Sequence, residues 1–240
     1  MRRIWWDAIP VFAAPFVAYG PSHLIVIGVL VAGIVAFLVF GRWTPRRFDR
    51  AFAVVIAVVA VPVQLLQFTP AEWNLQTSLP LQLCDWAWLV AAIALWTRSR
   101  LAGTIIYLWG LTLTTQAIMT PALTTPFPGL RWWMFWALHL LVVWAAVHVV
   151  WGMKLHPTWT TYWQAIAITL TWMVVTYGFN VIVGTNYGYL NGKPAQASAL
   201  DLLGPWPVYV FAEILIAAAA WALLTWPWTR QPREERLVLD

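Results

Sequence analysis

The sequence predicts an all-α protein that crosses a membrane several times. The chain of 240 residues is 62% hydrophobic and only 10% charged, whereas soluble domains are about 45 to 50% apolar and about 25% charged. Its mean hydropathy is +0.72. Such a chain has too little polar surface to cover itself in water, so lipid is the expected solvent. Many of its 20 tryptophans stand at the ends of apolar segments, where indole rings anchor a protein at the headgroup level.

Several apolar segments are long enough to cross the hydrocarbon core, which requires roughly twenty helical residues. In lipid each span must satisfy its own backbone hydrogen bonds, and the alternating pattern of barrel strands is missing from the sequence. We therefore expect a bundle of about seven transmembrane helices. The expected spans cover about residues 22–40, 51–68, 79–96, 101–119, 132–151, 162–183 and 206–226.

One membrane domain is expected over residues 22–228, because the chain shows no internal repeat. Residues 1–21 contain a short apolar stretch, at 4–19, that is interrupted by Asp7, Pro10 and Pro15. We interpret this stretch as an interfacial or re-entrant segment, since it is too short for a span and lacks a clean signal-peptide cleavage site. Residues 229–240 are expected to form a cytoplasmic polar tail.

The basic residues predict the orientation of the chain. Ten of the 14 Lys and Arg residues fall in the 41–50 loop, the two later loops on the same side and the C-terminal tail. The positive-inside rule therefore places the N-terminus outside and the C-terminus inside. The net charge of +5 is scattered over short loops and forms no basic stripe, so no nucleic-acid partner is expected.

The intramembrane polar residues gather in the outward-facing half of the bilayer. At 1.5 Å per helical residue, Cys84 lies roughly 8 Å from the outer end of its span, and His139 and Glu213 lie roughly 11 Å from the ends of theirs. Ionisable side chains in lipid almost always face the bundle interior or a water-filled cavity, so we expect a polar cavity open toward the outer leaflet. The residues expected to line it or to bind substrate are Gln82, Asp85, Gln116, Asn180, Asn186, Tyr187 and Glu213.

Each candidate also has a structural interpretation. Cys84, the only cysteine, is by itself more often a small buried hydrophobe than a nucleophile. His139, Asp85 and Glu213 are also able to hold helices together, and His148, near the opposite end of its helix, is expected to be structural or interfacial. One cysteine, one deep histidine and two carboxylates make a poor ligand set for zinc, so neither a metal nor a cofactor is expected.

Cys84 and His139 make chemical sense as a catalytic dyad, because they lie at matching depths. The imidazole would take the thiol proton, the thiolate would attack an ester carbonyl, and the resulting thioester would pass its acyl group to water or to a lipid hydroxyl. The backbone amides near Pro80 and in the turns of the GTNYG loop, residues 184–188, are expected to supply hydrogen bonds to the oxyanion.

Ordered motifs resemble those of the bacterial YwaF-type integral membrane family. This family is similar to an animal seven-span protein regarded as a cysteine-dependent acyltransferase of ether lysophospholipids, and more distantly to intramembrane hydrolases of fatty-acid esters. The resemblance implies that Cys84 accepts the acyl chain and that His139 is its partner. Family members often carry His at the position of Gln82, so a proton-transfer role there is absent from this chain. The motifs are LPLQLCDWAW (79–88), LTTQAIMTPAL (113–123), His139, GTNYGYLNGKP (184–194) and LLGPWPVY (202–209).

These observations favour an acyltransferase or lipid esterase of the bacterial cell membrane that acts on a phospholipid-like substrate. The alternative is a non-enzymatic transporter or lipid-binding protein, in which the same cavity binds a solute and Glu213 or Asp85 carries a coupling proton. A transporter requires a polar path through both halves of the membrane, and the inner halves of the spans are apolar. A structural membrane protein without a site of its own is the third possibility.

Overall fold

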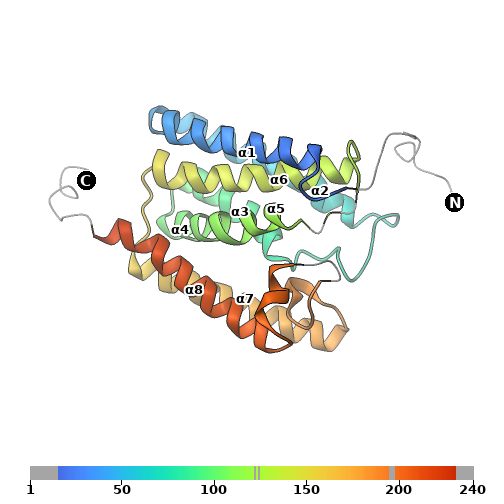
Figure 1. The fold of residues 1–240 in the computed structure, drawn as a ribbon. Coiled ribbons are helices and arrows are strands. Elements are labelled where there is room, and N and C mark those ends of the chain that lie inside the picture. The colour runs from blue at the N-terminus through green and yellow to red at the C-terminus, as the bar shows by residue number, and fades with distance from the viewer. Residues whose placement is uncertain (1–15, 122, 124, 195–197, 231–240) are drawn as a thin grey trace.

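The computed structural model describes residues 16–121, 123, 125–194 and 198–230, which form a bundle of helices (Figure 1). This described part of the chain contains no strand. Most of the expected N-terminal segment 1–21 and of the expected tail 229–240 lies outside the described residues. The α-helices are α1 (Pro21–Phe40), α2 (Arg46–Gln67), α3 (Leu83–Thr97), α4 (Arg100–Trp109), α5 (Thr115–Met119), α6 (Leu130–Val147), α7 (Trp159–Val183) and α8 (Val208–Thr229).

Short segments of other helical types connect or extend these helices. The π-helical segment η3 (Gly110–Thr114) joins α4 to α5, and a second one, η4 (His148–Gly152), extends α6. The 3-10 turn η2 (Gly41–Trp43) follows α1. The 3-10 turns η5 (Tyr187–Tyr189) and η6 (Ala199–Leu203) lie between α7 and α8.

Within the described residues, six helical segments are long and apolar enough to cross a membrane. The expected span 79–96 forms α3, which has 15 residues and begins only at Leu83. Pro80 explains the late start, because a proline disfavours helical backbone at the residue before it and cannot extend the hydrogen-bond ladder of a helix interior. The all-helical membrane bundle is confirmed, whereas the count of seven spans and the orientation stay predictions.

The helices form one elongated bundle, in which α7 and α8 are inclined to α1 and α6 (Figure 1). Helix α1 begins at the end of the bundle opposite to the one where α8 ends (Figure 1). Small residues bring the central helices close together, since Ala91 and Ala94 of α3 and Ala146 of α6 are fully buried. Close packing of small residues is the usual way in which membrane helices associate.

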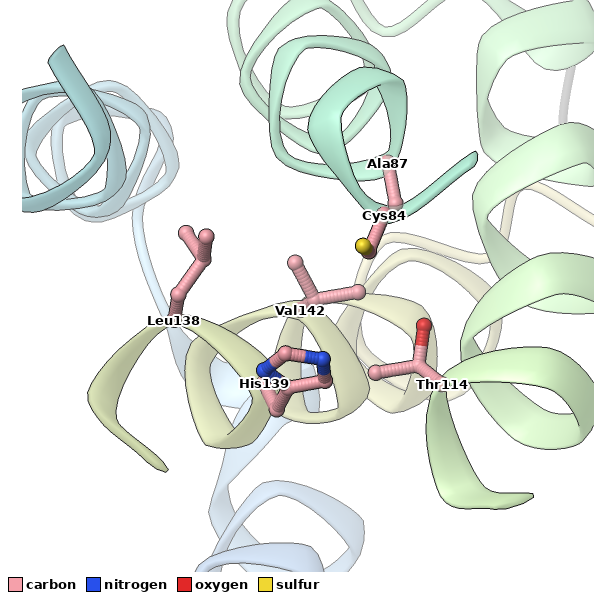
Figure 2. Close-up of a pocket in the computed structure, with 6 residues that line it drawn as sticks. All are labelled: Cys84, Ala87, Thr114, Leu138, His139 and Val142. Atoms are coloured by element: carbon pink, nitrogen blue, oxygen red, sulfur yellow. The ribbon is translucent and has the colours of Figure 1, made fainter. Parts of the chain in front are cut away.

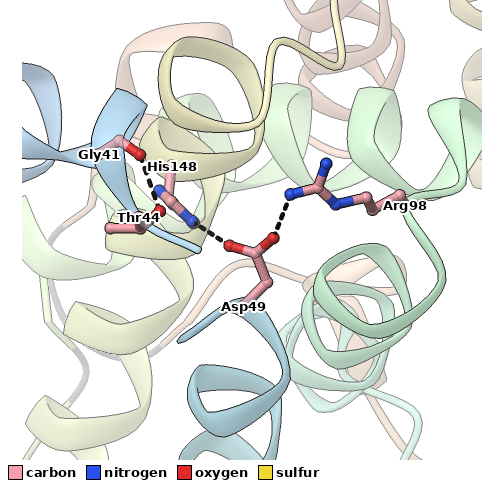
Figure 3. Close-up of polar contacts among 5 residues, drawn as sticks. All are labelled: Gly41, Thr44, Asp49, Arg98 and His148. Carbon is pink, nitrogen blue, oxygen red and sulfur yellow. Dashed lines mark hydrogen bonds and ion pairs between the residues drawn. The ribbon is translucent and has the colours of Figure 1, made fainter. Parts of the chain in front are cut away.

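A polar cluster, here named the Asp49 cluster, joins the buried side chains of Asp49 and His148 to the exposed side chain of Arg98 (Figure 3). Asp49 Oδ1 lies 2.8 Å from His148 Nε2, and Asp49 Oδ2 lies 2.5 Å from Arg98 Nη2. The side chains of Asp49 and His148 are 0% exposed. The cluster joins the first turn of α2, the end of α3 and η4. His148 therefore has the structural position expected of it. The range 41–50 was expected to form a loop, but α2 begins at Arg46, so Asp49 lies inside a helix.

Candidate functional site

A large cavity lies at the opposite end of the bundle from the Asp49 cluster. Its volume is about 1470 Å³, above the range of about 300–1,000 Å³ that is usual for small-molecule sites. Most of its wall is apolar, with residues such as Leu113, Phe135 and Trp221, and the ion pair between Glu72 and Arg131 also lines it. The other polar side chains of the wall include Gln67, Gln82, Cys84, Asp85, Thr114, Gln116, His139 and Glu213.

Cys84 and His139 both line a small recess of this cavity, here named the Cys84 pocket. Cys84, the second residue of α3, projects toward α6, and His139 lies on α6 with Val142 between the two side chains in this view (Figure 2). Within the described residues no hydrogen bond joins the thiol to the imidazole. Proton transfer between them therefore requires a side-chain rotation or one bridging water. The pocket is lined by Cys84, Ala87, Thr114, Leu138, His139 and Val142.

A backbone carbonyl orients the imidazole of His139. Its Nδ1 lies 2.7 Å from the carbonyl oxygen of Phe135, one turn earlier in α6. A carbonyl only accepts hydrogen bonds, so Nδ1 carries the proton and Nε2 of the neutral ring is left as an acceptor. The ring also stacks on Phe135, with the ring centroids 4.1 Å apart. His139 is thus oriented by the backbone and the ring of Phe135, and no carboxylate of the described residues is hydrogen-bonded to it.

Gln82 and Asp85 fix the start of α3 in addition to lining the cavity. The carboxylate oxygen Oδ2 of Asp85 accepts the backbone N–H of Gln82 at 2.9 Å. The side-chain oxygen of Gln82 accepts the N–H of Gly188 at 2.9 Å. The first hydrogen bond caps α3, and the second ties the segment that carries Cys84 to the loop between α7 and α8.

The other predicted residues divide into two groups. Gln116 and Glu213 line the cavity, whereas Asn180, Asn186 and Tyr187 are not among its lining residues. The amide nitrogen of Asn180 donates to the carbonyl of Tyr187 at 2.8 Å. The Tyr187 hydroxyl donates to a carbonyl of the 68–82 connection at 2.6 Å, and Asn186 makes hydrogen bonds within its own loop. The structure therefore places these three residues in the framework of the loop.

The backbone amides expected as oxyanion donors are already occupied. The N–H of Leu79 donates to the Tyr187 hydroxyl at 3.0 Å, and that of Tyr187 donates to Asn180 Oδ1 at 2.9 Å. The N–H of Gly188 donates to Gln82, as described above. The expectation is wrong for these amides, because the hydrogen bonds that shape the loop use the same N–H groups.

Tyr189 is a cavity residue that the sequence patterns did not single out. Its φ of 54° lies in the left-handed region, which is rare for an aromatic residue. Two hydrogen bonds hold this conformation, one from its N–H to Asn186 and one from the Tyr209 hydroxyl to its carbonyl. Burial raises the pKa of the Tyr189 phenol, and the charge of a Cys84 thiolate raises that pKa further. Tyr189 therefore belongs to the electrostatic surroundings of Cys84. Its only sequence signal is its place in the GTNYGY motif.

The chain matches a known protein family over most of its length. The model of the TMEM164 family matches residues 18–225 of the chain. Neither a curated protein nor a solved structure matches it. The matched range contains every residue that lines the cavity and all three residues of the Asp49 cluster.

Proposed function

The chain belongs to the TMEM164 family, and from this membership and the cavity we propose that it is an acyltransferase or lipid esterase of the bacterial cell membrane. Within that family we place it with the YwaF-type proteins. One observation carries the proposal: the only cysteine of the chain and a deeply placed histidine, which come from different helices, line the same pocket of a large cavity. Buried groups of this kind inside a membrane are costly and are usually functional.

The proposed reaction proceeds through a thioester on Cys84. Nε2 of His139 takes the thiol proton, and the thiolate attacks the carbonyl carbon of a lipid ester. The C–S bond forms, the C–O bond of the ester breaks, and the leaving alkoxide takes the proton from the imidazolium. Water or a lipid hydroxyl then attacks the thioester, again with His139 as the base. Cys84 is released as a thiol, and the acyl group leaves as a fatty acid or a new ester.

A phospholipid-like substrate suits the walls of the cavity. Side chains such as Leu113, Ile166 and Trp221 offer an apolar surface for an acyl chain. Polar groups are gathered around Cys84, where the ester linkage would lie. With the orientation predicted from the basic residues, the cavity faces the outer leaflet, so the lipid would enter from there.

Labelling with an alkyne-tagged acyl phospholipid tests this proposal on the purified protein in nanodiscs. Wild type is expected to form a hydroxylamine-sensitive adduct on Cys84, and Cys84→Ala is expected to form none. His139→Ala should slow labelling by about 10²–10⁴-fold, the usual contribution of a general base. His156→Ala is the matched control, because His156 lies outside the cavity and stacks on Trp228. Equal labelling of wild type and Cys84→Ala would refute the thioester mechanism.

A further inference from the structure

The Thr114 side chain is buried in the Cys84 pocket, and its hydroxyl has no hydrogen-bond partner among the described residues. The residue is only 4% exposed, and its hydroxyl oxygen lies on the side that faces Cys84 (Figure 2). The neighbouring threonines differ from it. Thr112 donates to the carbonyl of Leu108 at 2.6 Å, and Thr115 donates to the carbonyl of Gly110 at 3.0 Å.

The π-helical segment η3 explains why this hydroxyl is free. A threonine inside a helix usually donates to the carbonyl four residues earlier, which for Thr114 is the carbonyl of Gly110. In η3 the helical register is shifted, and Thr115, five residues after Gly110, takes that carbonyl instead. Thr114 is left facing the pocket. Single π-helical turns inside α-helices are frequent at functional sites.

Close packing of η3 on α6 places Thr114 beside His139. A Cβ atom added to Gly110 would lie 2.5 Å from the Cβ of Ala146, so only glycine permits this approach. Three groups able to take part in acyl transfer, those of Cys84, His139 and Thr114, therefore line one pocket whose other lining residues are Ala87, Leu138 and Val142.

We propose that Thr114 is a catalytic residue of this reaction, whose Oγ–H donates a hydrogen bond to the substrate carbonyl oxygen during attack by Cys84. As the C–S bond forms, the electron pair of the C=O bond moves onto that oxygen, and Thr114 stabilises the negative charge without transferring its proton. When the ester C–O bond breaks, the pair returns and the carbonyl is restored. The N–H groups of Leu79, Tyr187 and Gly188 are engaged elsewhere, so the Thr114 hydroxyl supplies a hydrogen-bond donor that these amides do not. This inference rests on the proposed function.

The rate of Cys84 acylation by a p-nitrophenyl acyl ester tests the inference. Thr114→Val keeps the shape of the side chain and removes the hydroxyl, and it is expected to slow acylation by about 10²–10³-fold, as loss of one oxyanion donor does. Thr114→Ser keeps the hydroxyl and should restore most of the rate. Thr171→Val is the matched control, because it removes a threonine hydroxyl that donates to its own helix at Ala167 and does not line the cavity, and it should react like wild type.

Alkylation of Cys84 by iodoacetamide separates catalysis from packing, because it forms a C–S bond without an oxyanion. The proposal requires that Thr114→Val alkylates at the wild-type rate while its acylation is slow. Equal slowing of both reactions would show that Thr114 only shapes the pocket, and unchanged acylation would show that its hydroxyl is not used. Either result overturns the inference and leaves the proposed function standing. A wild-type protein without Cys84-dependent acylation overturns both.

Discussion

Replacing Asp49 with alanine is expected to destabilise the bundle by about 1–4 kcal/mol. The substitution leaves His148, whose side chain is 0% exposed, without a partner for Nε2, and an unsatisfied buried group costs about 1–3 kcal/mol. It also removes the ion pair with Arg98, whose side chain is 39% exposed, and a pair open to solvent contributes about 0–1 kcal/mol. The loss of the hydrogen bond to His148 is therefore the larger part of the expected destabilisation.

Unfolding of the detergent-solubilised protein in increasing sodium dodecyl sulfate, followed by circular dichroism, measures this free energy. Arg98→Gln is the comparison, and it should cost less than Asp49→Ala, because Asp49 keeps its hydrogen bond to His148 and the lost guanidinium is exposed. Asp49→Asn should fall between the two variants, since its amide oxygen still accepts a hydrogen bond from His148. If Asp49→Ala costs no more than Arg98→Gln, the bond between Asp49 and His148 does not stabilise the fold, and the reasoning from burial is wrong.

Three further predictions concern the fold around the two ends of the bundle. Gly152→Ala should destabilise the protein by about 1–3 kcal/mol in the same unfolding assay, because its Cβ would lie 2.3 Å from His148 Nδ1. Gly178→Ala, which meets nothing within 4 Å, should be neutral or stabilising. Burial, followed by two nearby cations, lowers the pKa of His156. The unfolded chain then binds more protons there, so stability should fall as the pH drops from about 7 to 5. His156→Gln should remove that part of the pH dependence. If the free energy of unfolding of this variant falls with pH as steeply as that of wild type, the prediction is wrong. Tyr187→Phe removes hydrogen bonds to the backbone of residues 75 and 79. Backbone hydrogen exchange around these residues should therefore be faster than in wild type, while exchange in α4 should be unchanged.

The sequence was sufficient to predict most of the long helices. The hydrophobic pattern predicted a span at 22–40, and α1 covers Pro21–Phe40. It predicted 162–183, and α7 covers Trp159–Val183. These elements are predictable because lipid demands long apolar helices. The fixed helical rise also relates position in the sequence to depth, which is why Cys84 and His139 were expected at one level.

Only the tertiary structure decided which groups at one level contact one another. Hydropathy does not encode the rotation of a helix or a local π-helical turn, so it gave no sign that Thr114 faces the Cys84 pocket while Thr115 bonds to its own helix. Asp49 stood among arginines and was expected in a loop, but packing of α2 buries it against His148. The loop amides were expected to be free, but Gln82, Asn180 and Tyr187 use them. Hydrogen-bond partners depend on side chains from distant parts of the chain, and their directions are fixed only when the helices pack.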